Sequence, residues 1–336
     1  MDTVVRLDAV TRAFRVATRT VGFRATVKGL FRRQYKVSRA VRDVTFDASA
    51  GEILGVLGPN GSGKTTTLKC VAGLLTPTSG RLDVLGFTPH QRDRAFLRRI
   101  GFIMGQRTQL HADVSVFDSL ELRRVIYGLT DQQFRDSKAE LTELLGLAEF
   151  GDAPVRQLSL GQRMRCELAA ALLHRPEVVL LDEPTIGLDF EAQAAIRAFV
   201  EAYVAGHGAC VLLTSHYLAD IEALAGRVVV LAKGRLVFDG SLAGLRRMGS
   251  DHQVVTLTYD DADQAPDRAQ VEALAGPDAA VTVKPGEVEV AAPRSQAPRI
   301  LAALGALPGV SGLALADPPL EDTLAHLYAE DEPADG

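Results

Sequence analysis

The sequence has few cysteines and no long apolar run, and both absences limit what this protein can be. Its 336 residues include three cysteines, Cys70, Cys166 and Cys210, which lie in apolar segments without metal-like spacing. We therefore expect small core residues in a reducing compartment. No apolar run approaches the roughly 20 residues that cross a bilayer, and the N-terminus lacks the charged-then-apolar pattern of a secretion signal. These absences predict a chain without membrane-spanning segments that stays in the cytoplasm.

Acidic residues are absent from one stretch near the N-terminus. From Arg15 to Arg42 the sequence has nine lysines and arginines and no acid, and apolar residues within it recur at helical spacing. This pattern predicts a short basic amphipathic insertion at about residues 17–34. Two interpretations stay open for it. One is contact with an anionic lipid surface or the cytoplasmic edge of a membrane protein, and the other is an ordinary solvated helix packed on its domain.

Basic residues are scarce in the last quarter of the chain. Residues 251–336 contain 16 acidic and four basic residues, a net charge of −12, which leaves +7 for the first 250 residues. This asymmetry predicts a basic first part that faces an anionic nucleotide and a membrane surface, followed by an acidic, solvated part.

A glycine-rich segment between an apolar run at 52–57 and a helix-like stretch indicates a phosphate-binding loop. Glycines allow successive backbone N–H groups to curl around phosphate oxygens without obstruction by Cβ atoms. Lys64 is expected to reach the β- and γ-phosphates, and Thr65 to offer its hydroxyl to Mg²⁺ at the positive end of a helix. The segment therefore predicts a bound nucleoside triphosphate with Mg²⁺. The predicted loop consists of Gly58, Pro59, Asn60, Gly61, Ser62, Gly63, Lys64, Thr65 and Thr66.

Two adjacent carboxylates follow a second apolar run, at 178–181. Buried carboxylates are costly unless they have a partner or a chemical role. At the end of a core strand beside a phosphate loop, Asp182 is placed to orient Mg²⁺ and its water shell. Glu183 is placed to polarise the water that attacks the γ-phosphate. Together with the loop, this pair predicts hydrolysis of the nucleotide.

These two motifs make residues 3–240 resemble the ATP-binding cassette ATPases, the motor subunits of ABC transporters. The resemblance implies ATP as the nucleotide. It also implies an α/β P-loop cassette with an inserted helical lobe, and the order of apolar runs and helical patterns agrees with that fold class. We expect the nucleotide-binding domain at 1–245 and the helical lobe at about 92–173.

Further nucleotide contacts are implied by the resemblance. Ser159, Gly161 and Gln162 resemble the family signature, which caps the γ-phosphate bound by the opposite subunit. Leu160 stands where the family usually has a glycine. From its residue type and position, Ser159 is also expected to cap the helix that follows it, and a helix N-terminus is a sound anion site. Asp189 lies in a segment that resembles the loop through which two cassettes sense each other.

Two polar residues complete the catalytic set that the resemblance implies. His216 follows an apolar run at 209–213 and resembles the switch histidine that senses the γ-phosphate. A parallel strand would present it at the carboxyl edge of the sheet, where ligands bind. Gln106 is assigned, in preference to Gln109, as the glutamine that touches Mg²⁺ and the attacking water, because the residues after it then fit the family spacing.

The aromatic residue that stacks on adenine has two candidates. Phe14 lies in an early strand-like segment, and Tyr35 has the usual family spacing from the segment that begins at Ala40. Base stacking on an aromatic face contributes about 1 to 3 kcal/mol, by analogy with nucleic-acid platforms. The sequence leaves both candidates open.

The part after Gly240 predicts a separate small domain. Strand-like alternation and helical patterns give a β-α-β-β-α-β order, which predicts a ferredoxin-like domain at 251–330. A ligand-sensing regulatory module and a dimer-stabilising appendage are alternatives, and we favour the appendage because the segment has no convergent polar cluster. The expected strands are 253–259, 280–284, 287–291 and 310–316, and the expected helices are 267–274 and 298–307.

Together these observations predict the ATP-hydrolysing motor subunit of a bacterial ABC exporter. The resemblance implies that two copies close head to tail on two MgATP, at the cytoplasmic face of the cell membrane. One or two polytopic permease subunits would then export a drug, an antibiotic or another amphipathic compound. The alternatives are a polysaccharide or lipid-linked exporter cassette and a soluble ABC ATPase that acts on ribosomes or DNA. The soluble class usually has two cassettes or long coiled-coil arms, neither of which occurs here, so we expect no nucleic-acid partner.

Overall fold

The computed structural model describes residues 2–17, 35–105, 108–215, 217–248, 252–261 and 265–330. The chain separates into two compact units, Met1–Gly240 and Ser241–Gly336. The basic insertion expected at 17–34 lies outside the described residues except for Ala17, which ends the first strand. No helix in the described ranges is long and apolar enough to span a membrane.

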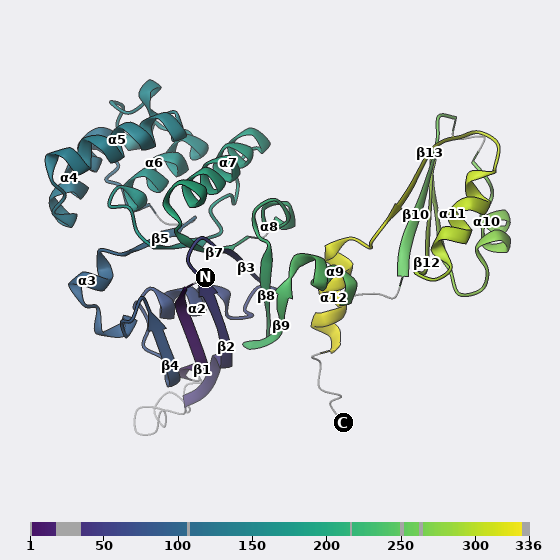
Figure 1. Cartoon of the computed structure of the whole chain (residues 1–336), viewed down its shortest axis with the longest axis horizontal. Coiled ribbons are helices and arrows are strands. Elements are labelled where there is room, and N and C mark those ends of the chain that lie inside the picture. The colour runs from purple at the N-terminus through teal and green to yellow at the C-terminus, as the bar shows by residue number, and fades with distance from the viewer. Residues whose placement is uncertain are drawn as a thin grey trace, which may run out of the picture. The chain divides into compact units, whose positions relative to one another are not determined.

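A central six-stranded sheet forms the scaffold of the first unit (Figure 1). Its order is β5-β6-β7-β3-β8-β9, and the neighbouring pairs from β5 through to β8 run parallel. Every residue of β6 and β7 is buried, as expected for apolar runs that form strands covered on both faces. These strands are β3 (Ile53–Leu57), β5 (Ile100–Met104), β6 (Val178–Asp182), β7 (Cys210–Thr214), β8 (Arg227–Ala232) and β9 (Arg235–Ser241).

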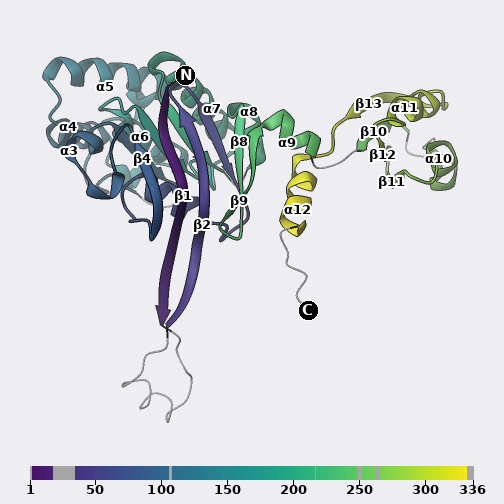
Figure 2. The same cartoon turned by 60° about the horizontal axis from the view of Figure 1, so that its bottom comes forward.

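A second, antiparallel sheet has the order β2-β1-β4. It contains β1 (Thr3–Ala17), β2 (Tyr35–Ser49) and β4 (Ser79–Val84). Figure 2 shows β1 and β2 running side by side well beyond the end of β4. Helix α2 (Lys64–Val71) packs against strands of both sheets, so the start of α2 is fixed from two sides.

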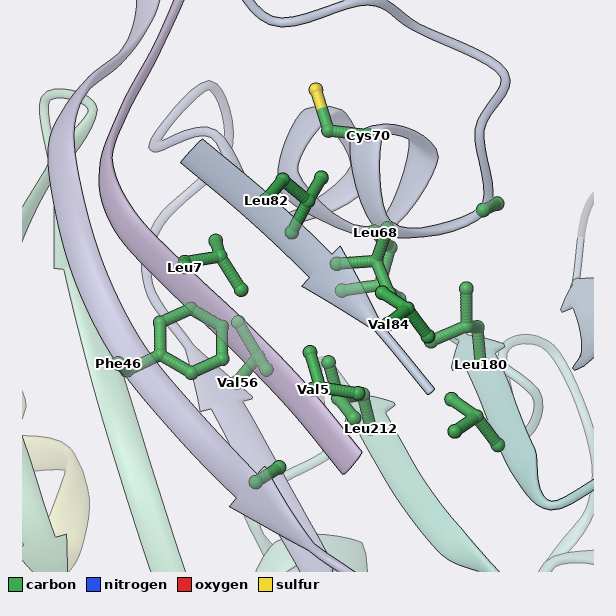
Figure 3. Packing of buried hydrophobic residues seen from close by; sticks show 14 of the residues in the cluster. Val5, Leu7, Phe46, Val56, Leu68, Cys70, Leu82, Val84, Leu180 and Leu212 are labelled. Atoms are coloured by element: carbon green, nitrogen blue, oxygen red, sulfur yellow. The ribbon is translucent and has the colours of Figure 1, made fainter. Parts of the chain in front are cut away.

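The core of this unit lies between the two sheets and α2 (Figure 3). Leu7 and Phe46 come from the antiparallel sheet, Leu180 and Leu212 from the central sheet, and Leu68 from the helix. Each is at most 4% exposed. Burying a side chain of this size contributes about 1.5 to 3 kcal/mol, so the same residues that form the core also hold the strand ends in place.

A helical region is inserted between β5 and β6 (Figure 1). Its helices have strong sequence boundaries: Ser115, Thr130 and Ser159 accept hydrogen bonds from backbone amides as N-caps. Two of the helices end at glycines with positive φ, Gly128 and Gly146. The range 92–173 expected for the lobe also includes β5, a core strand whose short apolar run could not be told from a helix segment by periodicity.

The remaining elements of the first unit connect or cover these layers. The long helix α7 begins at Phe190, seven residues after Glu183. The helices are α3 (Arg94–Leu97), α4 (Val116–Tyr127), α5 (Asp131–Leu145), α6 (Leu160–Leu172), α7 (Phe190–His207) and α8 (Leu218–Leu224), with single 3-10 turns at Pro89–Gln91, Leu147–Glu149 and Val155–Gln157.

The second unit is an antiparallel sheet of order β11-β12-β10-β13 with two helices packed against it. Its core includes Val255, Val271, Val290 and Ile300, contributed by both strands and helices. The β-α-β-β-α-β order confirms the sequence prediction. The elements are α9 (Leu242–Met248), β10 (His252–Tyr259), α10 (Arg268–Ala275), β11 (Ala280–Lys284), β12 (Glu287–Pro293), α11 (Ala297–Gly305), β13 (Val310–Ala316) and α12 (Leu320–Glu330).

His174 joins the helical region to the central sheet through a largely buried imidazole ring. Its ring stacks on Tyr127 with centroids 3.7 Å apart, and its Nε2 donates to the Ile100 carbonyl oxygen at 3.1 Å. Its Nδ1 is buried and has no hydrogen-bond partner among the described residues. Burial lowers the pKa of His174 to about 4, the bond to Ile100 opposes this shift, and the positive charge of Arg123 adds to it.

Stability is expected to fall as the pH drops from about 6.5 towards 4, because the unfolded chain protonates this histidine while the folded protein resists it. The full difference corresponds to about 3 kcal/mol at most. His174→Phe keeps an aromatic ring at this position and removes the titratable group. Its free energy of unfolding should therefore vary less than that of the wild type between pH 4 and about 6.5. Urea unfolding at several pH values measures the effect, with His90→Phe at an exposed position as the control. Parallel pH curves for wild type and His174→Phe would contradict the assignment.

Candidate active site

The phosphate-loop segment connects β3 to α2 through backbone conformations that require glycine. Gly58, Gly61 and Gly63 have φ angles of 147°, 81° and 108°. A Cβ atom on Gly58 would lie 2.2 Å from the Leu231 carbonyl oxygen, and one on Gly63 would lie 2.4 Å from the Ala40 carbonyl oxygen. Backbone carbonyl groups therefore pack directly against the loop, and only glycine is accommodated at these two positions.

The start of α2 has the properties of an anion site. Its N-cap, Gly63, supplies no side-chain hydrogen bond, so the first-turn amides are left for a ligand or for water. The Ser62 hydroxyl is buried and lacks a hydrogen-bond partner within the described ranges. Buried polar groups are normally satisfied. The glycine cradle, the uncapped amides and this hydroxyl together fit the oxygens of a nucleotide phosphate.

Lys64 lies at the first position of α2 and is 5% exposed. Its ammonium donates hydrogen bonds to the carbonyl oxygens of Gly58 at 2.5 Å and Pro59 at 3.2 Å. Burial lowers the pKa of Lys64, whereas the negative charges of Glu183 and Asp182 oppose that shift. A buried cation inside a glycine-rich loop is costly without an anionic ligand, so its burial favours binding of phosphate.

Asp182 connects the end of β6 to the phosphate loop. Its Oδ1 accepts hydrogen bonds from the hydroxyls of Thr65 and Thr214, both at 2.9 Å. Among the described residues, no three His, Cys, Asp or Glu side chains form a metal cluster. Mg²⁺ does not need one, because it prefers one or two protein oxygens together with water and substrate phosphates. The oxygens of Thr65 and Asp182 fit such a site.

Glu183 has a left-handed backbone, with φ of 57°, directly after Asp182. Its N–H donates to the carbonyl oxygen of Thr214 at 3.0 Å and to the Thr214 hydroxyl at 3.1 Å. Gly105 packs from the other side: its N–H donates to the Asp182 carbonyl oxygen at 2.8 Å, and a Cβ there would lie 2.0 Å from the Glu183 carbonyl oxygen. Such backbone outliers persist where the surroundings fix them, and they cluster at functional sites.

Ser159 and Asp189 begin two helices that lie against each other. Ser159 and Gln162 form a reciprocal capping box. The backbone N–H of Gln162 donates to the Ser159 hydroxyl at 3.2 Å, and the backbone N–H of Ser159 donates to the side-chain oxygen of Gln162 at 2.9 Å. Asp189 caps α7 through the Ala192 amide at 2.8 Å. A Cβ on Gly161 would lie 2.9 Å from the Cβ of Ala192, so the two helix starts form one surface.

Several expected site residues lie outside what the structure describes. Gln106 and His216 are not among the described residues, and neither is the side chain of Tyr35, although its backbone begins β2. Phe14 is described: it lies in β1 opposite Ser38 and carries the Arg12 guanidinium 4.7 Å from its ring centroid. The adenine-stacking residue therefore stays a prediction with two candidates.

The structure adds residues that the sequence reasoning missed. Glu167, in α6, is 3% exposed, and its carboxylate accepts hydrogen bonds from the amides of Gln109 and Leu110. Burial raises the pKa of Glu167, and these two backbone bonds oppose the shift. The Gln109 side chain donates to the Phe102 carbonyl oxygen at 2.6 Å. A carboxylate within an apolar helix face was the signal in the sequence, but its partners lie about 58 positions away.

Comparisons with known proteins agree with this geometry. A family model described as ABC transporter matches residues 41–186. The ABC transporter ATP-binding protein NatA of Bacillus subtilis (strain 168) is 32% identical over 215 residues, which cover 64% of this chain and 87% of the relative. The daunorubicin resistance ATP-binding protein DrrA3 of Streptomyces coeruleorubidus is 38% identical over 233 residues, or 69% of this chain and 73% of that protein.

Solved structures show the same fold. A dimeric, post-hydrolysis ATP-binding cassette bound to ADP and Pi superposes with a TM-score of 0.59 and covers 71% of this chain and 98% of its own. At 24% sequence identity the likeness concerns the fold alone. The α/β cassette with a separate C-terminal antiparallel domain is therefore confirmed.

Proposed function

This chain belongs to the ABC transporter family as an ATP-binding subunit that hydrolyses ATP for transport, and from that premise we propose that it drives export of a drug, an antibiotic or another amphipathic compound. The observation that carries the exporter assignment is the 38% identity to a daunorubicin resistance ATP-binding protein over 69% of the chain. The exporting path belongs to separate permease subunits at the membrane, with this subunit at its cytoplasmic face.

The hydrolytic chemistry that we propose uses the groups gathered at the strand ends. Lys64 and the loop amides would bind the β- and γ-phosphates, and the oxygens of Thr65 and Asp182 would hold Mg²⁺, which would neutralise charge on the phosphates. Glu183 accepts the proton of the water that attacks the γ-phosphate. The family resemblance assigns the γ-phosphate contact to His216 and the contact with Mg²⁺ and the water to Gln106.

A second copy of the chain is proposed to complete each site. The surface formed by the starts of α6 and α7 carries two exposed apolar side chains, Leu160 at 38% and Phe190 at 80% exposure. Ser159 and the backbone at Gly161 lie on the same surface. In a head-to-tail dimer this surface would cap the γ-phosphate on the opposite loop. A dimeric cassette among the similar structures supports this arrangement.

A cavity of about 640 Å³ is the proposed docking site for the permease. It lies between α3, β5 and the end of α4, and its lining combines apolar residues such as Leu97 and Ile126 with the arginines Arg94 and Arg98. Ile126 is 58% exposed, and Val125 beside it is 65% exposed. Such a lining suits a short, apolar helix of a membrane subunit that carries an acidic residue.

Capture from membranes tests this function. Tagged Glu183→Gln protein with ATP, recovered from gently solubilised native membranes, should bring one or two polytopic membrane proteins in fixed ratio, identified by mass spectrometry. Adding Ile126→Asp should lower that recovery at least about tenfold, because a charge on the docking surface opposes an apolar partner. Leu144→Asp, on an exposed apolar residue of α5 away from the cavity, is the matched control. Recovery of ribosomal proteins without a membrane partner would contradict the exporter.

A further inference from the structure

Asp220, on α8, lies at the centre of a buried hydrogen-bond network beside the proposed catalytic groups. Its side chain is 1% exposed, although it is a carboxylate. Its Oδ2 accepts from the Thr185 hydroxyl at 2.5 Å and the Ser215 hydroxyl at 2.7 Å, and its Oδ1 accepts from an Arg197 nitrogen at 2.7 Å. Side chains from the segment after β6, from α7 and from the end of β7 therefore meet on one carboxylate.

Each partner of Asp220 belongs to a segment that matters for hydrolysis. Thr185 lies two residues after Glu183, inside a turn that is closed by a bond from the Ile186 amide to the Glu183 carbonyl oxygen at 3.3 Å. Ser215 follows Thr214 at the end of β7, and its hydroxyl accepts from the Tyr217 amide at 3.0 Å. The residues on both sides of position 216 are thus held by one hydroxyl.

The third partner lies on the helix that begins at the proposed dimer surface. Arg197 lies two helical turns into α7, the helix whose N-terminus Asp189 caps. Its side chain is 16% exposed and pairs directly with Asp220. A buried ion pair leaves a costly unpaired charge when either partner is lost, so this contact fixes α7 relative to α8.

We propose that Asp220 is a positioning residue for ATP hydrolysis, which holds the Glu183 turn, Ser215 and helix α7 in one arrangement. Because β6 and β7 are adjacent strands, their carboxyl-end loops are neighbours, and the Glu183 amide already bonds Thr214 where the strands end. Asp220 joins the two loops beyond that point by binding one side chain from each, Thr185 and Ser215. The inference rests on the proposed role of Glu183 as the base, since Asp220 acts through the placement of that residue.

Two single-hydroxyl variants test the proposal without unpairing Arg197. Thr185→Val and Ser215→Ala each remove one donor to Asp220 and leave the ion pair intact. We expect each to lower kcat for ATP about tenfold, with KM for ATP changed less than about twofold, because the phosphate loop is untouched while the base loses its position. Thr185→Ser restores the hydroxyl and should restore kcat. The controls are thermal unfolding and Thr142→Val, which alters a buried hydroxyl that lacks a hydrogen-bond partner within the described ranges.

The double variant separates positioning from simple destabilisation. Both hydroxyls act through the same carboxylate, so the combined loss in kcat should be smaller than the product of the two single losses. Asp220→Asn should lower kcat more than either single variant does, again with KM for ATP measured beside kcat. Wild-type kcat in both Thr185→Val and Ser215→Ala, or losses that follow only the unfolded fraction, would overturn the proposal. Glu183→Gln is assayed alongside. If it is inactive while both single variants have wild-type kcat, only the positioning role of Asp220 is wrong. If Glu183→Gln hydrolyses ATP rapidly, both the base role of Glu183 and the positioning role of Asp220 are wrong.

Discussion

Glu183→Gln is expected to lower kcat for ATP hydrolysis by about 100-fold or more while ATP stays bound and two copies stay associated. The amide cannot accept the proton of the attacking water, and general-base catalysis contributes about 10² to 10⁴ in rate. The substitution keeps the size of the side chain. It also keeps the backbone of residue 183, whose N–H bonds to Thr214 hold the left-handed turn. ATP binding through the phosphate loop should therefore persist.

The trapped state can be measured directly. Single-turnover release of phosphate reports the chemical step, and size-exclusion chromatography with and without ATP reports association of two chains. Glu149→Gln, an exposed glutamate at the end of the short turn after α5, is the matched control and should behave as wild type in both assays. Rapid turnover by the Glu183→Gln protein would remove Glu183 from the role of base. Failure to dimerise with ATP would count against the head-to-tail site.

Lys64→Met should weaken ATP binding strongly without unfolding the protein. The ammonium bonds two carbonyl oxygens of the loop and supplies the buried positive charge for the phosphates, so affinity for ATP should fall by about 100-fold. Stability without nucleotide should change by less than about 1 kcal/mol. The reason is that burial already lowers the pKa of Lys64, so removing the charge relieves a desolvation cost that offsets the lost bonds.

Thermal or urea unfolding with ATP separates these two effects. A ligand at 100 times its dissociation constant stabilises the folded state by about 2.7 kcal/mol, and Lys64→Met should lose most of this increment. Lys69→Met, later on the same helix, should keep it. If Lys64→Met were stabilised by ATP as strongly as the wild type, the phosphate-loop assignment would be wrong. If it were unfolded without ATP, the lysine would be structural.

Local sequence patterns were sufficient for most of the fold. The apolar runs that end at Leu57 and Asp182 are the central strands, and the strands expected after residue 251 agree with β10 to β13 within about two residues. These strands could be predicted because the apolar residues that they bury form a run or an alternation within one short segment. Strand β5 lies inside the range expected for the helical lobe, and it could not be distinguished from a helical segment, because five residues with mixed burial show no clear period.

Most partners within the site could not be predicted from local patterns. Thr65 and Asp182 are 117 positions apart and meet only because β3 and β6 are both neighbours of β7 in the sheet. Asp220 reads in sequence as one more acid on a short helix. Its proposed role follows from the packing of α8 against α7 and from its bonds to the loop ends, and local periodicity carries no information on these contacts.

The sequence by itself predicted the phosphate loop, the paired carboxylates and a second domain, because each prediction depends on residue types at fixed spacing along one segment. The tertiary structure decided which side chains share a carboxylate, as Thr65 and Thr214 do on Asp182 and as Thr185, Ser215 and Arg197 do on Asp220. The physical reason is that a hydrogen bond requires two atoms within about 3 Å. For residues far apart in the chain, only strand order and helix packing set that distance.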